Sequence, residues 1–223
     1  MKGRKYLLPR YPVPKNWAGG HAAPRHSGPV RSALSVFLLS CAAVRLFAGA
    51  PLLLVTHSLA IHGHGTLTWA APATWEHTAP SPAAPPDAPM AFRWRAPGNH
   101  PTVLVSVAWD GIAGNKGKPD GAILAVLVKT FAEKQYAAQS VEKAAKVETV
   151  KSDAVTVSYA SFTDPKFIAK EPPPDETRNM TVGMFRSGPL WGNFTLMTND
   201  KDGDELREAM ALVRSLRGMA PAK

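Results

Sequence analysis

The chain opens with a basic leader that runs directly into an apolar stretch, and a segment rich in proline and alanine follows. Residues 1–55 contain eight lysines and arginines and no acidic residue. Residues 33–55 (ALSVFLLSCAAVRLFAGAPLLLV) are almost wholly apolar, and a membrane-spanning helix needs about 20 such residues. A basic flank before an apolar segment is typical of membrane targeting, with the basic end left in the cytoplasm. The order therefore predicts that the folded part lies on the extracytoplasmic side of a membrane, with the N-terminus cytoplasmic if the leader is uncleaved.

Two interpretations of this apolar segment stay open. Residues 33–55 could remain as an anchor, although a central Arg45 costs about 2.5–3.5 kcal/mol on insertion scales. Alternatively, residues 46–55 form the apolar part of a cleaved signal peptide. Cys41 is the only cysteine, so an intrachain disulfide is excluded. It follows Leu-Leu-Ser as in a bacterial lipobox, but the apolar run continues beyond it, which favours an ordinary apolar role.

The composition along the chain predicts four segments. They are a basic disordered leader (1–32), a signal anchor or signal-peptide core (33–55), a Pro/Ala-rich linker (56–89) and one domain (90–220). That domain has the ordinary length of about 100–150 residues. The net charge of +9 invites a nucleic-acid interpretation, but beyond residue 90 there are eighteen basic and fifteen acidic residues. A nucleic-acid interface needs a basic face on the folded part, so we expect no nucleic-acid partner.

Residue patterns within 90–220 predict the element order β-β-α-β-β-β-β-α. Phe92, Trp94 and Ala96 alternate with arginines, as in a strand with one wet face. Apolar residues at helical spacing predict a helix from about Pro119 to Tyr136. The remaining elements are a strand at 102–109, hairpins at 146–151/154–160 and 179–186/190–198, and a terminal helix that begins near Asp202 and ends near Gly218 as its C′ residue. The expected fold is α+β, a mostly antiparallel sheet with two packed helices in an α/β sandwich.

Two expected features concern single elements. In the first helix, Ile123, Val126, Leu127 and Phe131 fall on one face, which Leu124 and Val128 widen. In the first hairpin, Ser152-Asp153 is expected to be a two-residue connection.

The motifs of known chemistry are weak. His57, His62 and His64 have ligand chemistry, but a solvated linker explains them better, because no carboxylate or cysteine is near. Asp200, Asp202 and Asp204 fail the calcium-loop spacing, and helix capping accounts for them. Asn179 and Asn193 begin glycosylation sequons, for which chance is the default. We expect no catalytic residue, no cofactor and no metal site.

Five residues are predicted to contact a partner. Aromatic and arginine side chains are enriched at protein interfaces. The predicted contacts are Arg93, Trp94, Arg95, Arg186 and Trp191.

The run GMFRSGPLWGNFTLMTNDKDGDELREAMALVRSLRG (183–218) places an acidic turn and an amphipathic helix after a hairpin. This layout resembles the closing unit of PsbP-like and DcrB-like domains. The resemblance implies a small extracytoplasmic sandwich with a non-catalytic accessory role, and it carries over no functional residue. We therefore predict an exported or membrane-anchored interaction module, an accessory subunit with a protein partner at a membrane. The alternative is a periplasmic enzyme or small-ligand-binding protein, whose deep pocket would contain His100, Asp110 or another acid with a shifted pKa.

Overall fold

A computed structural model describes residues 53–61, 63–78, 89–98, 100–109 and 121–221. In these residues the fold is α+β, with two α-helices and two antiparallel sheets of three and seven strands. The expected α+β class is thus confirmed. Residues 33–52 of the predicted apolar segment, Cys41 included, and residues 79–88 of the predicted linker lie outside the described residues. No α-helix within the described ranges has the length and apolar character needed to cross a bilayer.

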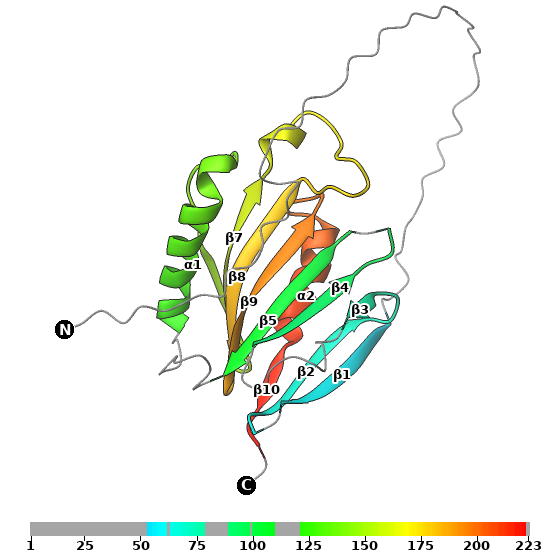
Figure 1. The fold of residues 1–223 in the computed structure, drawn as a ribbon, viewed down its shortest axis with the longest axis vertical. Coiled ribbons are helices and arrows are strands. Elements are labelled where there is room, and N and C mark those ends of the chain that lie inside the picture. Colours follow the sequence, from blue (N-terminus) through cyan, green and yellow to red (C-terminus); the bar gives the residue numbers. More distant parts are fainter. Residues whose placement is uncertain (1–52, 62, 79–88, 99, 110–120, 222–223) are drawn as a thin grey trace, which may run out of the picture. The chain divides into compact units, whose positions relative to one another are not determined.

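The large sheet is antiparallel throughout and has the order β3-β4-β5-β9-β8-β7-β6 (Figure 1). Its central strands are rich in β-branched and aromatic residues, which favour strands. The strands are β3 (Glu76–Thr78), β4 (Met90–Arg95), β5 (Thr102–Trp109), β6 (Glu148–Lys151), β7 (Thr156–Thr163), β8 (Asn179–Ser187) and β9 (Leu190–Thr198).

Both predicted hairpins are present. In the second, Ser187 pairs with Leu190, so Gly188 and Pro189 make a two-residue turn, and Gly188 has a φ of 55°. In the first, Lys151 pairs with Thr156, so the connection has four residues and not the two that were expected. Within this connection Ser152 N donates to the Val155 carbonyl at 2.9 Å and Val155 N donates to Ser152 Oγ at 3.2 Å, so the tip of the loop is Asp153 and Ala154, one residue later than expected.

The small sheet has the order β1-β2-β10. Two of its strands lie where the sequence predicted the start of a linker, so that part of the prediction is wrong. Its strands are β1 (Leu54–Ile61), β2 (Gly65–Pro72) and β10 (Arg217–Met219). With β3, residues 54–78 are therefore part of the fold, and the domain begins well before residue 90. Trp69 and Leu67 on β2 are buried at 3% and 0% exposure. Their burial stabilises this hairpin, because an apolar side chain removed from water contributes about 1.5–3 kcal/mol.

Helix α1 (Gly121–Gln135) contacts β7 and β8, and it confirms the first predicted helix. Its expected apolar face is partly wrong. The buried residues are Leu124, Val128 and Ala132, whereas Ile123 and Val126 are 36% and 64% exposed. Both stripes are apolar, so spacing alone does not choose between them. In the fold, the stripe of Leu124, Val128 and Ala132 is the one that faces the sheet.

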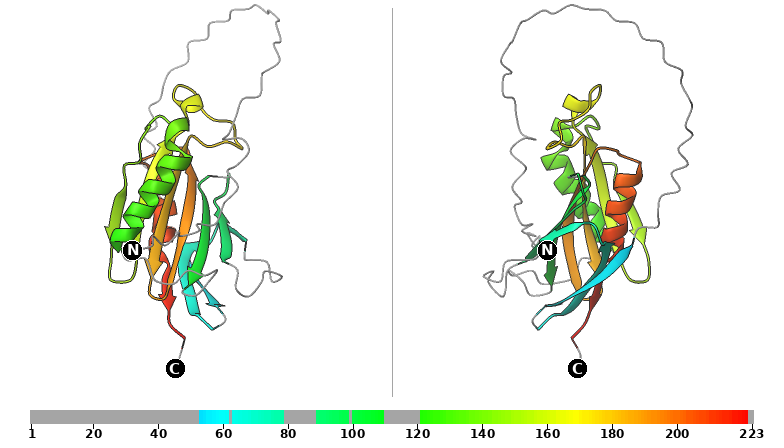
Figure 2. Two further views of the ribbon diagram at one scale, coloured as in Figure 1. Left: turned by 60° about the vertical axis from the view of Figure 1, so that its left-hand side comes forward. Right: turned by 90° about the vertical axis from the view of Figure 1, so that its right-hand side faces the viewer.

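Helix α2 (Asp204–Ser215) contacts β9 and β2. Tyr136, just beyond α1, meets Phe162 of β7 at 5.8 Å, whereas Tyr159 of the same strand lines a hollow with α2. Residues of odd and even number on a strand point to opposite faces. The two helices therefore cover opposite faces of the large sheet, as the side views show (Figure 2).

At α2, the expected capping by an acid is confirmed, whereas the expected end of the helix at Gly218 is wrong. Asp200 accepts hydrogen bonds from the N–H groups of Glu205 and Leu206, both at 3.3 Å, so an acid does cap the helix. Gly218 is not the C′ residue. The chain leaves the helix at Leu216 and continues as β10, because Arg217–Met219 pairs with β2 and this satisfies the backbone that a helix cap would otherwise satisfy.

Candidate functional site

The two arginines of β4 lie on one face of the large sheet, and Trp94 lies on the other. Arg93 is exposed and Arg95 is half-buried, whereas Trp94 is 0% exposed. This is the alternation predicted for β4. It also means that Trp94 is a core residue, which a partner docking on the surface would not touch. Arg95 already interacts within the chain, so it is not an unengaged cation.

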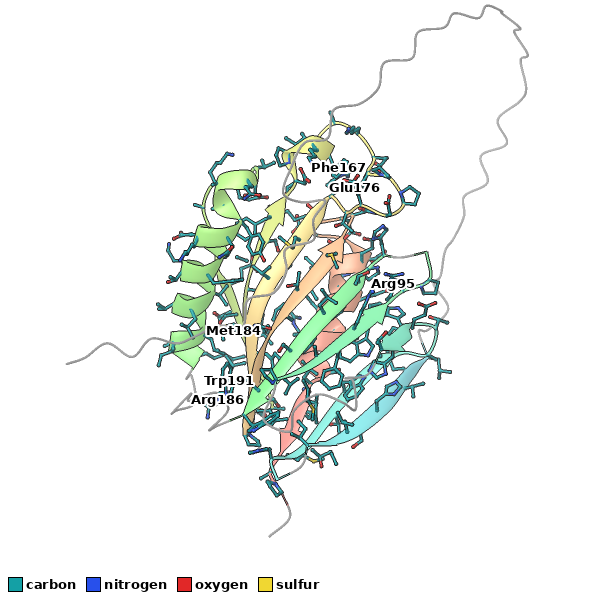
Figure 3. All side chains as sticks on the ribbon, viewed as in Figure 1. Arg95, Phe167, Glu176, Met184, Arg186 and Trp191 are labelled. Carbon is teal, nitrogen blue, oxygen red and sulfur yellow. The ribbon has the colours of Figure 1, made fainter. Side chains whose placement is uncertain are left out.

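Arg186 and Trp191 lie on the same sheet face as these arginines. Arg93 pairs with Leu104, which pairs with Thr195, and Trp191 lies four residues before Thr195 on β9. Arg186 pairs with Trp191. Figure 3 shows Arg186, Trp191 and Met184 together near one end of the sheet, with Arg95 near the other. The structure thus brings four of the five predicted residues onto one face, but in two separate groups. Trp191 is only 8% exposed, and Arg186 has interactions within the chain.

On the opposite face, an open groove of about 670 Å³ runs between α2 and β7. We call it the arginine groove. Its charged side chains are three arginines and one acid, Asp202, and apolar residues of α2 complete it. Its lining residues are Tyr159, Asp202, Leu206, Arg207, Met210, Ala211, Arg214, Ser215 and Arg217.

The three arginines differ in how far the protein already engages them. Arg217 donates from Nη1 to the carbonyls of Arg214 at 2.6 Å and Leu216 at 2.9 Å, so it closes the end of α2. Arg207 pairs with Asp204 one turn earlier on the same helix. Arg214 is exposed and hydrogen-bonds to the side chain of Tyr159. Arg214 is therefore the groove arginine best placed to meet a ligand.

Tyr159 provides the hydroxyl group of the groove. It donates from Oη to Glu148 Oε2 at 2.7 Å across the β6–β7 pair. The pKa of Tyr159 is raised, first by burial and then by the hydrogen bond to Glu148 and its negative charge, while Arg214 opposes the shift. The phenol thus keeps its proton at neutral pH, and its oxygen accepts a hydrogen bond from Arg214.

The other candidate residues from the sequence lie away from the arginine groove or outside the described residues. Asn179 is 2% exposed and accepts from Thr163 Oγ1 at 3.2 Å, so the folded protein does not present it for glycosylation. His100 Nε2 lies 3.1 Å from the Pro174 carbonyl and does not line the arginine groove. Asp110 and His62 lie outside the described residues.

A second cluster brings two histidines together with three core aromatic residues, and we call it the His–Trp cluster (His57, Trp69, His77, Phe92 and Trp94). His57 stacks on Trp69, with centroids 5.4 Å apart and planes at 12°. His77 stacks on Trp94 at 5.3 Å and 19°. The two indoles meet edge to face at 5.6 Å. This cluster joins the small sheet to the β3 edge of the large one.

The cluster replaces the solvated histidine linker that the sequence predicted. His57 lies in the middle of β1, whereas His64 lies in the turn between β1 and β2 and stacks on Trp109 at 4.6 Å. The pKa of His77 is lowered by burial and by the positive charge that His57 carries when protonated. Only the tertiary fold brings His57 to His77. No sequence spacing signals a contact between different sheets.

The arginine groove did leave a signal that was interpreted differently. Arg207, Met210, Ala211 and Arg214 follow the i, i+3, i+4, i+7 spacing of one helix face. From the sequence alone, these residues were interpreted only as part of the terminal helix that begins near Asp202. Comparison with models of known protein families and with curated proteins found no match for this chain. The geometry of the described residues is therefore the basis for the functional proposal.

Proposed function

We propose that this chain is a non-catalytic interaction module whose arginine groove binds an acidic segment of a partner protein. In this proposal the leader delivers the domain to the extracytoplasmic face of a membrane, where it serves as an accessory subunit of a membrane complex. The α/β sandwich and its targeting segment, expected from the sequence, belong to the same proposal. The observation that carries it is the groove, with three arginines and a single acid among its lining residues.

The chemistry of the groove favours a carboxylate-bearing peptide. Guanidinium groups bind carboxylates with two parallel hydrogen bonds, and this geometry makes arginine the preferred residue at such sites. Leu206 and Met210 add apolar surface beside the charges. An acidic segment that also carries apolar side chains satisfies both features. A groove that is open along a helix suits a segment of chain better than a small enclosed ligand.

The test uses the purified full chain in detergent and a short fluorescent peptide of glutamates interspersed with leucines. Fluorescence anisotropy should report binding, and a peptide with glutamine in place of glutamate should not bind. Arg214→Gln should weaken binding about tenfold or more, because a hydrogen bond to a charged group contributes about 1.5–3 kcal/mol and 1.4 kcal/mol is tenfold.

The matched control is Lys134→Gln, which removes the same charge from an exposed position on α1. It should bind the peptide as the wild type does. Equal binding by wild type and Arg214→Gln would refute the assignment of the groove. Equal weakening in both variants would show that net charge alone attracts the peptide, and it too would refute the proposed site.

A further inference from the structure

His57 and His77 come from different sheets, and their imidazole rings meet at the surface of the His–Trp cluster. His57 lies on β1, and His77 lies on β3, the edge strand of the large sheet. The ring centroids are 5.9 Å apart, with the planes tilted at 45°. We propose that these two histidines bind a divalent transition-metal ion. Among the first-row ions, Cu²⁺ should bind most tightly.

The spacing of the rings fits two ligands on one ion. Metal–imidazole bonds are about 2.0–2.1 Å long, and two imidazoles on one ion then have centroids roughly 4.5–6.4 Å apart, depending on the N–metal–N angle. The observed 5.9 Å falls in this range. His57 is half-buried and His77 is exposed, so a hydrated ion reaches both rings from solvent.

The protein also holds both rings in place before any ion arrives. Each imidazole lies flat against a buried indole, His57 on Trp69 and His77 on Trp94. The two indoles are 3% and 0% exposed, so they form a rigid base. Side chains that packing already restricts lose little conformational freedom when they bind an ion. Sites on strands are also held more precisely than sites on loops.

The donor set decides the class of ion. Imidazole nitrogen suits copper, nickel and zinc, whereas calcium and magnesium need oxygen ligands. Among first-row divalent ions, a given nitrogen site binds Cu²⁺ most tightly. In the described ranges no three histidine, cysteine or acidic side chains gather to hold an ion. The ion would therefore keep water or another ligand in its remaining positions, and such open positions accept a further group.

The test is a titration of the full chain, purified in detergent, with Cu²⁺ while tryptophan fluorescence is recorded. Because Trp69 and Trp94 stack on the ligand rings, Cu²⁺ bound there should quench their emission. The variants are His57→Phe and His77→Phe, which keep an aromatic ring for stacking but remove the nitrogen donors. The control is His64→Phe, because His64 lies in the β1–β2 turn and stacks on Trp109, outside the His–Trp cluster.

The wild type and His64→Phe should show saturable quenching at one equivalent of Cu²⁺, and His57→Phe and His77→Phe should lose it. The electron paramagnetic resonance spectrum of the bound Cu²⁺ should show two imidazole nitrogens in the wild type. Retained saturable quenching in either cluster variant, or loss of it in His64→Phe, would overturn the proposal. Should a phenylalanine variant fail to fold by circular dichroism, His57→Gln and His77→Gln make the same test. The site shares no residue with the arginine groove, so either proposal can fail alone.

Discussion

Glu142 connects three parts of the domain through one carboxylate. The effect of replacing it on the free energy of unfolding can be estimated from its hydrogen bonds. Its oxygens accept hydrogen bonds from Thr163 N and Oγ1, both at 2.8 Å, and from Lys201 Nζ at 2.7 Å. Thr163 ends β7, and Lys201 lies in the turn before α2. That turn also contains Asp202 of the arginine groove, so Glu142 helps to position one wall of the groove.

We expect Glu142→Gln to lower the free energy of unfolding by about 1–2 kcal/mol at pH 7. A hydrogen bond to a charged group contributes about 1.5–3 kcal/mol, and glutamine keeps one oxygen as an acceptor. The ion pair adds little, because the Lys201 side chain is 41% exposed and pairs near the surface contribute about 0–1 kcal/mol. Glu142→Ala removes every acceptor and should cost about 3 kcal/mol.

The effect should depend on pH in a defined direction. Burial raises the pKa of Glu142, but hydrogen bonds from Lys201 and Thr163 outweigh it, so the net pKa is below its ordinary value of 4.5. A lowered carboxyl pKa stabilises the fold above the unfolded value and loses this contribution as the pH falls through the folded value. The stability difference between wild type and Glu142→Gln should therefore shrink as the pH falls below 4.5.

Urea unfolding followed by tryptophan fluorescence at pH 7 and at pH 3.5 measures both effects. The control is Glu133→Gln on α1, which removes a carboxylate from an exposed pair with Lys129 at 3.4 Å. It should change stability by about 0.5 kcal/mol or less. Equal stability of wild type and Glu142→Gln at pH 7, or a difference that persists unchanged at pH 3.5, would refute this reasoning.

Three further predictions concern the sheet face, the topology and the packing. The sequence also predicted a partner contact through Arg93 and Arg95, on the sheet face opposite the arginine groove; if the partner reaches that face, Arg93→Ala plus Arg95→Ala should weaken capture of the whole partner by more than about 1 kcal/mol and leave peptide binding in the groove unchanged, and unchanged capture by the folded variant would remove this face from consideration. A reporter active only in the periplasm should give signal when fused after Lys223, and signal from a reporter active only in the cytoplasm would contradict this topology. Gly192→Ala should lower stability by about 1–3 kcal/mol in urea unfolding, because its Cβ would collide with the backbone oxygen of Ser106; an unchanged midpoint would contradict that close approach.

The sequence predicted the elements whose determinants are local. Alternating apolar residues marked β4, a run of β-branched and apolar residues marked β5, and Gly188 marked the turn between β8 and β9. The amphipathic run after the acidic turn marked α2. Neighbouring strands of a hairpin form from adjacent residues, so their pattern can be interpreted without knowing the rest of the fold.

The tertiary structure alone decided features that depend on contacts between distant residues. The stripe of α1 that faces the sheet depends on the shape of β7 and β8, because Ile123 and Leu124 are equally apolar. β10 exists only because Arg217–Met219 finds β2 as a partner. His57 meets His77, and Arg214 meets Tyr159, across elements that no fixed spacing connects. Hydrophobic periodicity records which side of an element is buried, but it does not record what that side is buried against.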